Sequence, residues 1–169
     1  MSLSQDIKQK EFRSEYQKAI LNILYTHNYL ITHMSDAFKD FDITRQQFNV
    51  LRILRGQYPK PATVNLIKDR MLDKMSDTSR IVERLRLKGL INREDSKNDK
   101  RAVEITITES GLELLEKMEG PVDNLEKLLY NLSEDETRQL NTLLDKMRGS
   151  QLDESEIAHE ELLNQQEKF

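Results

Sequence analysis

SDTSRIVERLRLKGLINREDSKNDKRAVEITI, residues 76–107, is the stretch that decides the fold. Its first half spaces apolar residues three or four apart, which predicts an amphipathic helix that begins at a Ser76 cap and ends at Gly89. The other side of this helix carries short hydroxyls and long cations, at Ser76, Thr78, Ser79, Arg80 and Arg84. We therefore expect one face to pack in a core and the other to be free to reach bases and phosphates.

The second half of the same stretch predicts a β-hairpin with a basic tip. Residues 102–108 alternate apolar with small or polar side chains, as a half-buried strand does, and residues 90–94 can pair with them. The connection contains nothing that could form a core, and its Asn and Asp suit a turn. Its charged residues are Lys97, Asp99, Lys100 and Arg101. A cationic loop held out on a two-stranded ribbon suits a groove or a phosphate backbone.

Charge is divided unequally along the chain. The whole sequence has a formal net charge of -4, which by itself disfavours binding to DNA. Residues 109–169, however, contain 16 acidic and 6 basic residues, whereas residues 1–108 contain 14 acidic and 20 basic ones. Because salt screens charges beyond about 8 to 10 Å, affinity for phosphates depends on the local cations and not on the total. The basic half includes the predicted helix and hairpin.

The composition excludes several classes of protein. The sequence has no cysteine, so disulfides and cysteine-ligated zinc are excluded. No apolar run approaches the roughly 18 residues of a membrane span, and the first residues do not have the pattern of a secretory signal. No Ser-His-Asp arrangement, phosphate-binding glycine loop or metal-spaced carboxylate group stands out. We expect a cytoplasmic protein that is not an enzyme, needs no cofactor or metal and does not contact a membrane.

The remaining sequence predicts further helices on both sides of this stretch. Capping boxes at Thr44 and Ser133 and a cap at Thr63 mark three helix starts, and a bend is expected at Gly120-Pro121. The predicted helices span residues 5–38, 46–55, 64–71, 108–132 and 134–149. With 33% charged residues, long helices that bury one apolar stripe against a partner subunit explain the composition better than a compact monomer does.

These elements predict a mainly α fold with a small β-hairpin wing. We expect a winged helix-turn-helix at about residues 43–107, flanked by dimerisation helices at 5–40 and 109–148. Together they would form one domain over residues 1–149, followed by an acidic helix or tail at 150–169.

Aromatic residues concentrate before residue 59 and allow two interpretations. Tyr25, His27, Tyr29 and Phe48 fit an aromatic effector pocket, but packing in a core or subunit interface is the more common role of such residues. His27 lies on the apolar stripe of its helix, where packing is commoner than metal binding.

The order of elements resembles the MarR family of bacterial transcriptional regulators over about residues 10–148. The matching segments are residues 43–54, 76–90 and 95–111. The resemblance implies that Arg101 enters the minor groove with Asp99 orienting it, and that the recognition helix faces the major groove. It also implies an obligate dimer and, often, a small-molecule effector. Residues 69–75 depart from the family pattern, because they lack the glycine common in the turn before the recognition helix.

Two functions remain open at this point. The first is a homodimeric, sequence-specific regulator of transcription, expected to be a repressor, which binds double-stranded DNA at a palindromic operator and is released by a small molecule. The second is a winged-helix dimer that serves protein interaction or chromosome organisation. Hydroxyls and arginines on the exposed face of the recognition helix favour the first, since a scaffold has no need of them.

Overall fold

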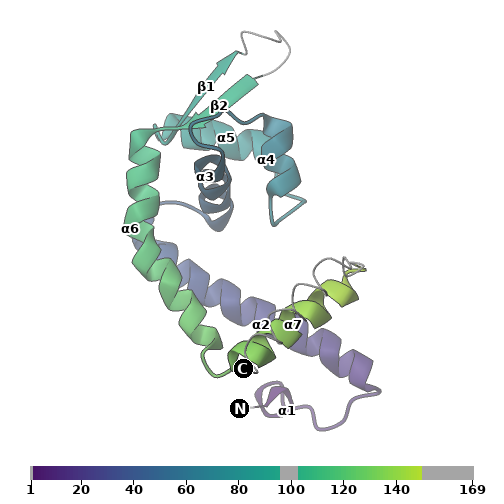
Figure 1. Ribbon diagram of the computed structural model, residues 1–169. Coiled ribbons are helices and arrows are strands. Elements are labelled where there is room, and N and C mark those ends of the chain that lie inside the picture. The colour runs from purple at the N-terminus through teal and green to yellow at the C-terminus, as the bar shows by residue number, and fades with distance from the viewer. Residues whose placement is uncertain (1, 96–102, 150–169) are drawn as a thin grey trace, which may run out of the picture. The chain divides into compact units, whose positions relative to one another are not determined.

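The computed structural model describes residues 2–95 and 103–149. The chain divides into two compact units, residues 1–125 and 126–169. The elements are α1 Leu3–Asp6, α2 Glu15–Phe38, η1 Lys39–Phe41, α3 Arg45–Gln57, α4 Val64–Arg70, α5 Thr78–Leu87, β1 Ile91–Asp95, β2 Val103–Ile107, α6 Glu109–Glu126, η2 Lys127–Leu129 and α7 Glu134–Met147 (Figure 1). None of the helices in these two ranges is long and apolar enough to span a membrane.

The starts of α3 and α4 are fixed by the side chains that the sequence predicted. Thr44 Oγ1 accepts a hydrogen bond from the Gln47 backbone N–H at 3.2 Å, and Gln47 Oε1 accepts one from the Thr44 N–H at 2.9 Å. Thr63 Oγ1 accepts from the Leu66 N–H at 3.2 Å. Each cap satisfies an amide that the helix cannot, a contribution of about 1 kcal/mol.

The core of the first unit lies where α3, α4 and α5 meet the hairpin, and the three helices gather beside the two strands in Figure 1. Leu51, Ile67, Leu85 and Ile105 are fully buried there. The apolar side of α5 predicted from the sequence is confirmed by the burial of Val82 and Leu85. Because this side packs inward, the exposed side of α5 is held in a fixed direction.

The hairpin is confirmed, and it is tied to the helices by a third segment. β1 and β2 are antiparallel in a register that pairs Ile91 with Ile107 and Asp95 with Val103. Ile105 on β2 also exchanges two backbone hydrogen bonds with Ala62, at 2.8 and 2.9 Å, just before α4 begins. The base of the wing is therefore anchored on both sides of β2.

The junction between α5, β1 and α6 is unusually tight. Thr108 Oγ1 donates a hydrogen bond to the Gly89 carbonyl at 2.8 Å and accepts one from the Gly111 N–H at 3.1 Å. A Cβ on Gly111 would lie 2.4 Å from the Leu90 carbonyl oxygen and 2.7 Å from Ile107 Cγ1. Only glycine allows α6 to approach the turn so closely.

Two sequence-based boundaries were wrong. The helix expected over residues 5–38 is interrupted: α1 ends at Asp6 and α2 begins at Glu15, because Ser14 Oγ accepts from the Gln17 N–H and starts a new helix there. The helix expected over residues 108–132 ends at Glu126 and is followed by η2. Pro121 lies inside α6.

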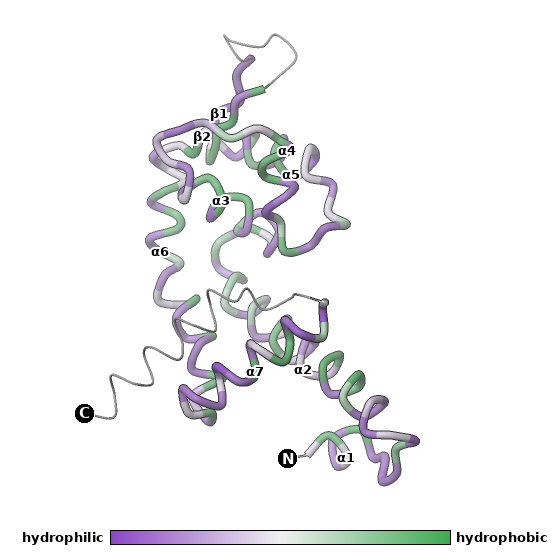
Figure 2. Tube along the Cα trace, turned by 45° about the vertical axis from the view of Figure 1, so that its right-hand side comes forward, coloured by the Kyte–Doolittle hydropathy of each residue, from purple (hydrophilic) through white to green (hydrophobic). Residues whose placement is uncertain are grey.

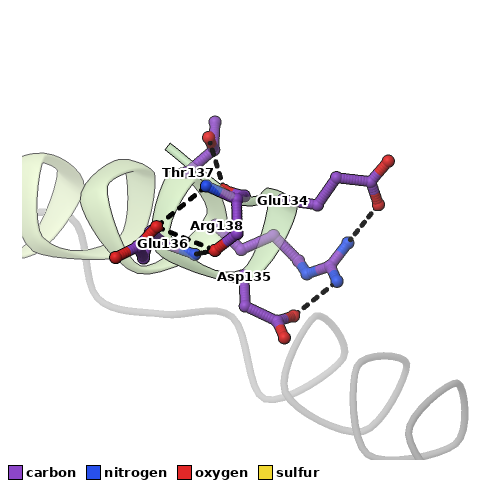
Figure 3. A network of polar contacts seen from close by, with 6 residues as sticks. Glu134, Asp135, Glu136, Thr137 and Arg138 are labelled. Atoms are coloured by element: carbon purple, nitrogen blue, oxygen red, sulfur yellow. Dashed lines mark hydrogen bonds and ion pairs between the residues drawn. The ribbon is translucent and has the colours of Figure 1, made fainter. Parts of the chain in front are cut away.

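The second unit contains α7, whose two faces differ sharply. Ser133 begins the helix with the predicted capping box, and Arg138 points toward Glu134 and Asp135, at 3.6 and 2.6 Å (Figure 3). The opposite side of the helix carries Leu140, Leu143 and Met147, which are 37%, 63% and 58% exposed. The polar face of α7 is thus satisfied within the helix, whereas its apolar face is not.

Candidate DNA interface

The recognition helix α5 begins one residue later than expected. Ser76 was predicted as its cap, but Asp77 caps it, because Asp77 Oδ1 accepts from the Arg80 N–H at 3.1 Å. The Ser76 hydroxyl instead donates to Asp73 Oδ2 at 2.8 Å. Ser76 is therefore part of the turn that precedes the helix, and its hydroxyl proton is already engaged.

Thr78 departs from the expectation that it lies on the exposed face. It is only 4% exposed, and its hydroxyl has no hydrogen-bond partner among the residues that the structure describes. The reason is the helical period: Thr78 lies four residues before Val82 and seven before Leu85, and therefore on the same buried side. Ser79, Arg80 and Arg84 are exposed, as expected.

The basic side chains of the α5 region fall into two classes. Arg86 forms a two-point ion pair with Glu83, at 2.7 and 3.0 Å, and Lys88 Nζ lies 2.9 Å from Asp42 Oδ2. No carboxylate within residues 2–95 or 103–149 forms an ion pair with Arg80 or Arg84. Arg80 and Arg84, both on the exposed face of α5, therefore stay available for phosphates or guanines.

The Glu83–Arg86 pair remains charged over the physiological pH range. The hydrogen bonds from Arg86 hold the pKa of the Glu83 carboxyl below its usual value, and those same bonds raise the pKa of the Arg86 guanidinium. Both groups are therefore ionised near neutral pH, and their charges cancel locally. Arg86 is in consequence a weaker candidate for a DNA contact than Arg84, two residues earlier.

Asp73 was not singled out by the sequence reasoning, although it organises the turn between α4 and α5. Its carboxylate accepts from the Ser76 hydroxyl and from the Met75 N–H, and these two bonds lower the pKa of Asp73. Asp73 is thus ionised at neutral pH. The signal was present in the sequence, because an Asp between two helices commonly accepts a hydrogen bond from the backbone two residues on, as Asp73 does from Met75.

The wing contributes its base to the described site but not its tip. β1 and β2 form this base, which ends at the pair of Asp95 with Val103. Residues 96–102 lie outside the described residues. They include the wing residues that were predicted to contact DNA: Lys97, Asp99, Lys100 and Arg101.

The four residues suggested for an effector pocket are not brought together. Phe48 is buried in the core, where its ring centroid lies 4.8 Å from that of Phe38. Tyr25 and Tyr29 share one face of α2, and His27 points to another, since residues two apart on a helix are separated by roughly 200°. All three α2 side chains are exposed.

Two open cavities of about 540 and 410 Å³ lie elsewhere in the first unit. Asp42 and Lys88, which form an ion pair, line both of them, and so does Ile43. Neither is lined by any of the four suggested pocket residues.

Comparison with known proteins gives consistent matches. The model of the MarR family matches residues 41–102. An HTH-type transcriptional repressor, IacR of Pseudomonas putida, is 29% identical over 140 residues, which are 80% of each chain. The crystal structure of a MarR transcription factor from Planctomyces limnophilus is 32% identical, with a TM-score of 0.61 over 80% of this chain and 98% of that one. The S. aureus MepR–DNA complex is 29% identical, with a TM-score of 0.70 over 83% and 100% of the two chains.

Proposed function

The chain belongs to the MarR family of transcriptional regulators, and on that premise we propose that it is a homodimeric repressor which occupies an inverted-repeat operator. The family consists of regulators and not of enzymes, and a relative of similar fold has been solved as a DNA complex. The observation that carries the proposal is the exposed face of α5, where Arg80 and Arg84 have no carboxylate partner in the described part of the chain.

In the proposed complex, α5 lies in the major groove with its N-terminal end toward the bases. Recognition helices of this class contact base edges mainly through their first turns, where Ser79 and Arg80 lie here. An arginine can form two parallel hydrogen bonds to O6 and N7 of guanine, which is the commonest specific contact in the major groove. We assign this role to Arg80 or Arg84, and hydrogen bonds to bases or phosphates to Ser79.

The wing is proposed to contact the DNA beside this groove. The support is the resemblance of residues 95–111 to the family pattern, together with an antiparallel hairpin base that Ala62 anchors at Ile105. In this proposal Arg101 enters the minor groove, Asp99 orients it, and Lys97 and Lys100 neutralise phosphates. Such contacts add affinity without sequence preference.

The homodimer is proposed on the apolar side chains that each unit leaves exposed. In the first unit, α2 exposes Tyr16, Ile20 and Leu24 at four-residue spacing; in the second, α7 exposes Leu140, Leu143 and Met147. Figure 2 shows hydrophobic and hydrophilic residues alternating along both helices. Stripes of this kind are typical of helices that pack against another subunit. Release of the operator by a small molecule stays a prediction.

Replacing the unpaired arginines should change sequence preference, and replacing the paired one should not. We expect Arg80→Ala or Arg84→Ala to remove discrimination of roughly 10- to 100-fold at one base pair in each half-site, because a two-point guanine contact is lost. Arg86→Ala is the matched control, since it removes the same charge from the same helix but breaks a pair with Glu83. The measurement is a selection of bound sequences by each full-length variant, combined with binding isotherms at several salt concentrations.

Three outcomes separate the roles. Loss of preference at one symmetric pair of positions supports direct reading by that arginine. Uniformly weaker binding with a smaller salt slope marks it as a phosphate contact. If Arg80→Ala and Arg84→Ala both bind like Arg86→Ala, the exposed face of α5 does not touch DNA and the proposal is wrong.

A further inference from the structure

The turn before α5 is held to α3 by a side-chain hydrogen bond. Asn49 on α3 accepts a hydrogen bond at its Oδ1 from the Leu72 backbone N–H, at 3.0 Å. The preceding residue, Met71, is 2% exposed and belongs to the core. The start of the turn is therefore fixed by both a buried anchor and a hydrogen bond across 23 residues of sequence.

Asp73 closes the other end of this turn. Its Oδ1 accepts from the Met75 N–H at 3.0 Å, and its Oδ2 accepts from the Ser76 hydroxyl at 2.8 Å. The Ser76 N–H also donates to the Asp73 carbonyl at 3.3 Å. The backbone at Met75 is thus ordered before any partner binds, so that little conformational entropy is lost when its side chain makes a contact.

This ordered turn exposes two large apolar side chains. Met75 is 93% exposed and Leu72 is 87% exposed, more than any exposed side chain of the α2 or α7 stripes. The two stripes have helical spacing and fit a partner helix, whereas Leu72 and Met75 lie in a turn and form no stripe. Met75 is two residues before the Asp77 cap, directly beside the end of α5 that the proposed function places in the major groove.

We propose that Met75 contacts the C5-methyl group of a thymine in each operator half-site, and that Asp73 and Asn49 position it there. This inference rests on the proposed function. The thymine methyl is the only apolar group that a base presents in the major groove, and an apolar side chain there distinguishes thymine from cytosine without a hydrogen bond. Methionine suits such a contact because its thioether is unbranched, polarizable and adaptable. Ser79, Arg80 and Arg84 would then form polar contacts with neighbouring bases.

The test removes one methyl group at a time from the DNA. The full-length protein first selects its operator from a random library, and each symmetric pair of thymines is then replaced by deoxyuridine, which pairs identically but lacks the methyl. We expect one pair of replacements to weaken wild-type binding roughly 15-fold, about fourfold for each methyl. Met75→Ala should bind the thymine operator as weakly as the wild type binds the deoxyuridine operator, and should show no further loss on replacement.

Leu87→Ala is the matched control, because Leu87 is an exposed apolar residue, 71% exposed, at the opposite end of α5. The Leu87→Ala variant should show the same loss of affinity on deoxyuridine replacement as the wild type.

Asp73→Ala should show a smaller loss of affinity on deoxyuridine replacement than the wild type. Thermal unfolding should show that Met75→Ala is as stable as the wild type, since this substitution removes only an exposed side chain.

The two proposals fail in different ways. Suppose that operator binding requires Arg80 or Arg84 but is not weakened by deoxyuridine at any position. That result overturns the role of Met75 and leaves the proposed function standing. The role of Met75 is also overturned if Met75→Ala retains the wild-type loss on replacement. A protein that selects no operator overturns both.

Discussion

Leu143→Glu is expected to leave the chain monomeric and to weaken operator binding by a factor on the order of 10² to 10⁴. Leu143 is the most exposed apolar residue on α7, and a charge there cannot be buried in a subunit interface without a partner. When the dimer separates, the two half-sites are no longer bound by one particle, and this size of loss is typical when linked binding sites are uncoupled. Light scattering should return a mass near the 19.9 kDa of one chain for the variant and twice that mass for the wild type.

The control for this variant is Asn141→Glu. It adds the same charge to the same helix at an exposed polar position. A dimeric mass and near wild-type binding are expected, because the side chain does not lie on the apolar stripe. Should Leu143→Glu remain dimeric at micromolar concentration, the apolar face of α7 is not the interface, and the proposed dimer has to be abandoned or moved to α2.

Gly111→Ala is expected to destabilise the first unit by about 2 to 3 kcal/mol. The added methyl would lie 2.4 Å from the Leu90 carbonyl oxygen, which is backbone and cannot rotate away as a side chain can. Forcing such groups apart costs typically 1 to 3 kcal/mol and displaces the first turn of α6, and the higher helix propensity of alanine offsets only part of this. Thermal unfolding should show a midpoint lower by roughly 4 to 12 °C.

Gly120→Ala separates this steric effect from the general effect of alanine in a helix. Gly120 is in the same helix, and no atom lies within 4 Å of the position its Cβ would take. This variant should be as stable as the wild type or more stable by about 0.5 to 1 kcal/mol. Equal stability for the two variants would show that α6 does not approach Leu90 as closely as described.

The winged helix-turn-helix could be predicted from the sequence because its determinants are local. The Thr44 and Ser133 capping boxes, the Thr63 cap and the alternating pattern of β2 each involve residues within a few positions of one another, and all are confirmed. Local patterns also separate the buried and exposed sides of α5 over most of its length, since Val82 and Leu85 are buried and Arg84 is exposed.

The helix starts that were predicted wrongly depend on competition between neighbouring capping groups. Ser76 and Asp77 are both good caps, and the choice between them was decided by Asp73, which engages the Ser76 hydroxyl. Thr78 was misplaced for another reason, because its spacing of four and seven residues from Val82 and Leu85 puts it with the core. A similar competition at Ser14 interrupts the long N-terminal helix.

Pairing between distant residues could not be predicted at all. The Glu83–Arg86 pair joins residues three apart on one helix, a spacing that the sequence does show. Lys88 instead pairs with Asp42, which is 46 positions away, and sequence spacing does not reveal such a pair. The same holds for Asn49, whose amide oxygen fixes the turn that carries Met75.

The central claim is that two copies of this chain read DNA symmetrically through α5. The most direct measurement is a selection from a random duplex library by the full-length protein at physiological salt, followed by sequencing of the bound fraction. We expect an enriched inverted repeat whose half-site centres are about 10 to 10.5 base pairs apart, because a two-fold dimer places its recognition helices in successive major grooves. A bound fraction with no enriched repeat would contradict the claim and would favour the alternative of a winged-helix dimer that serves protein interaction or chromosome organisation.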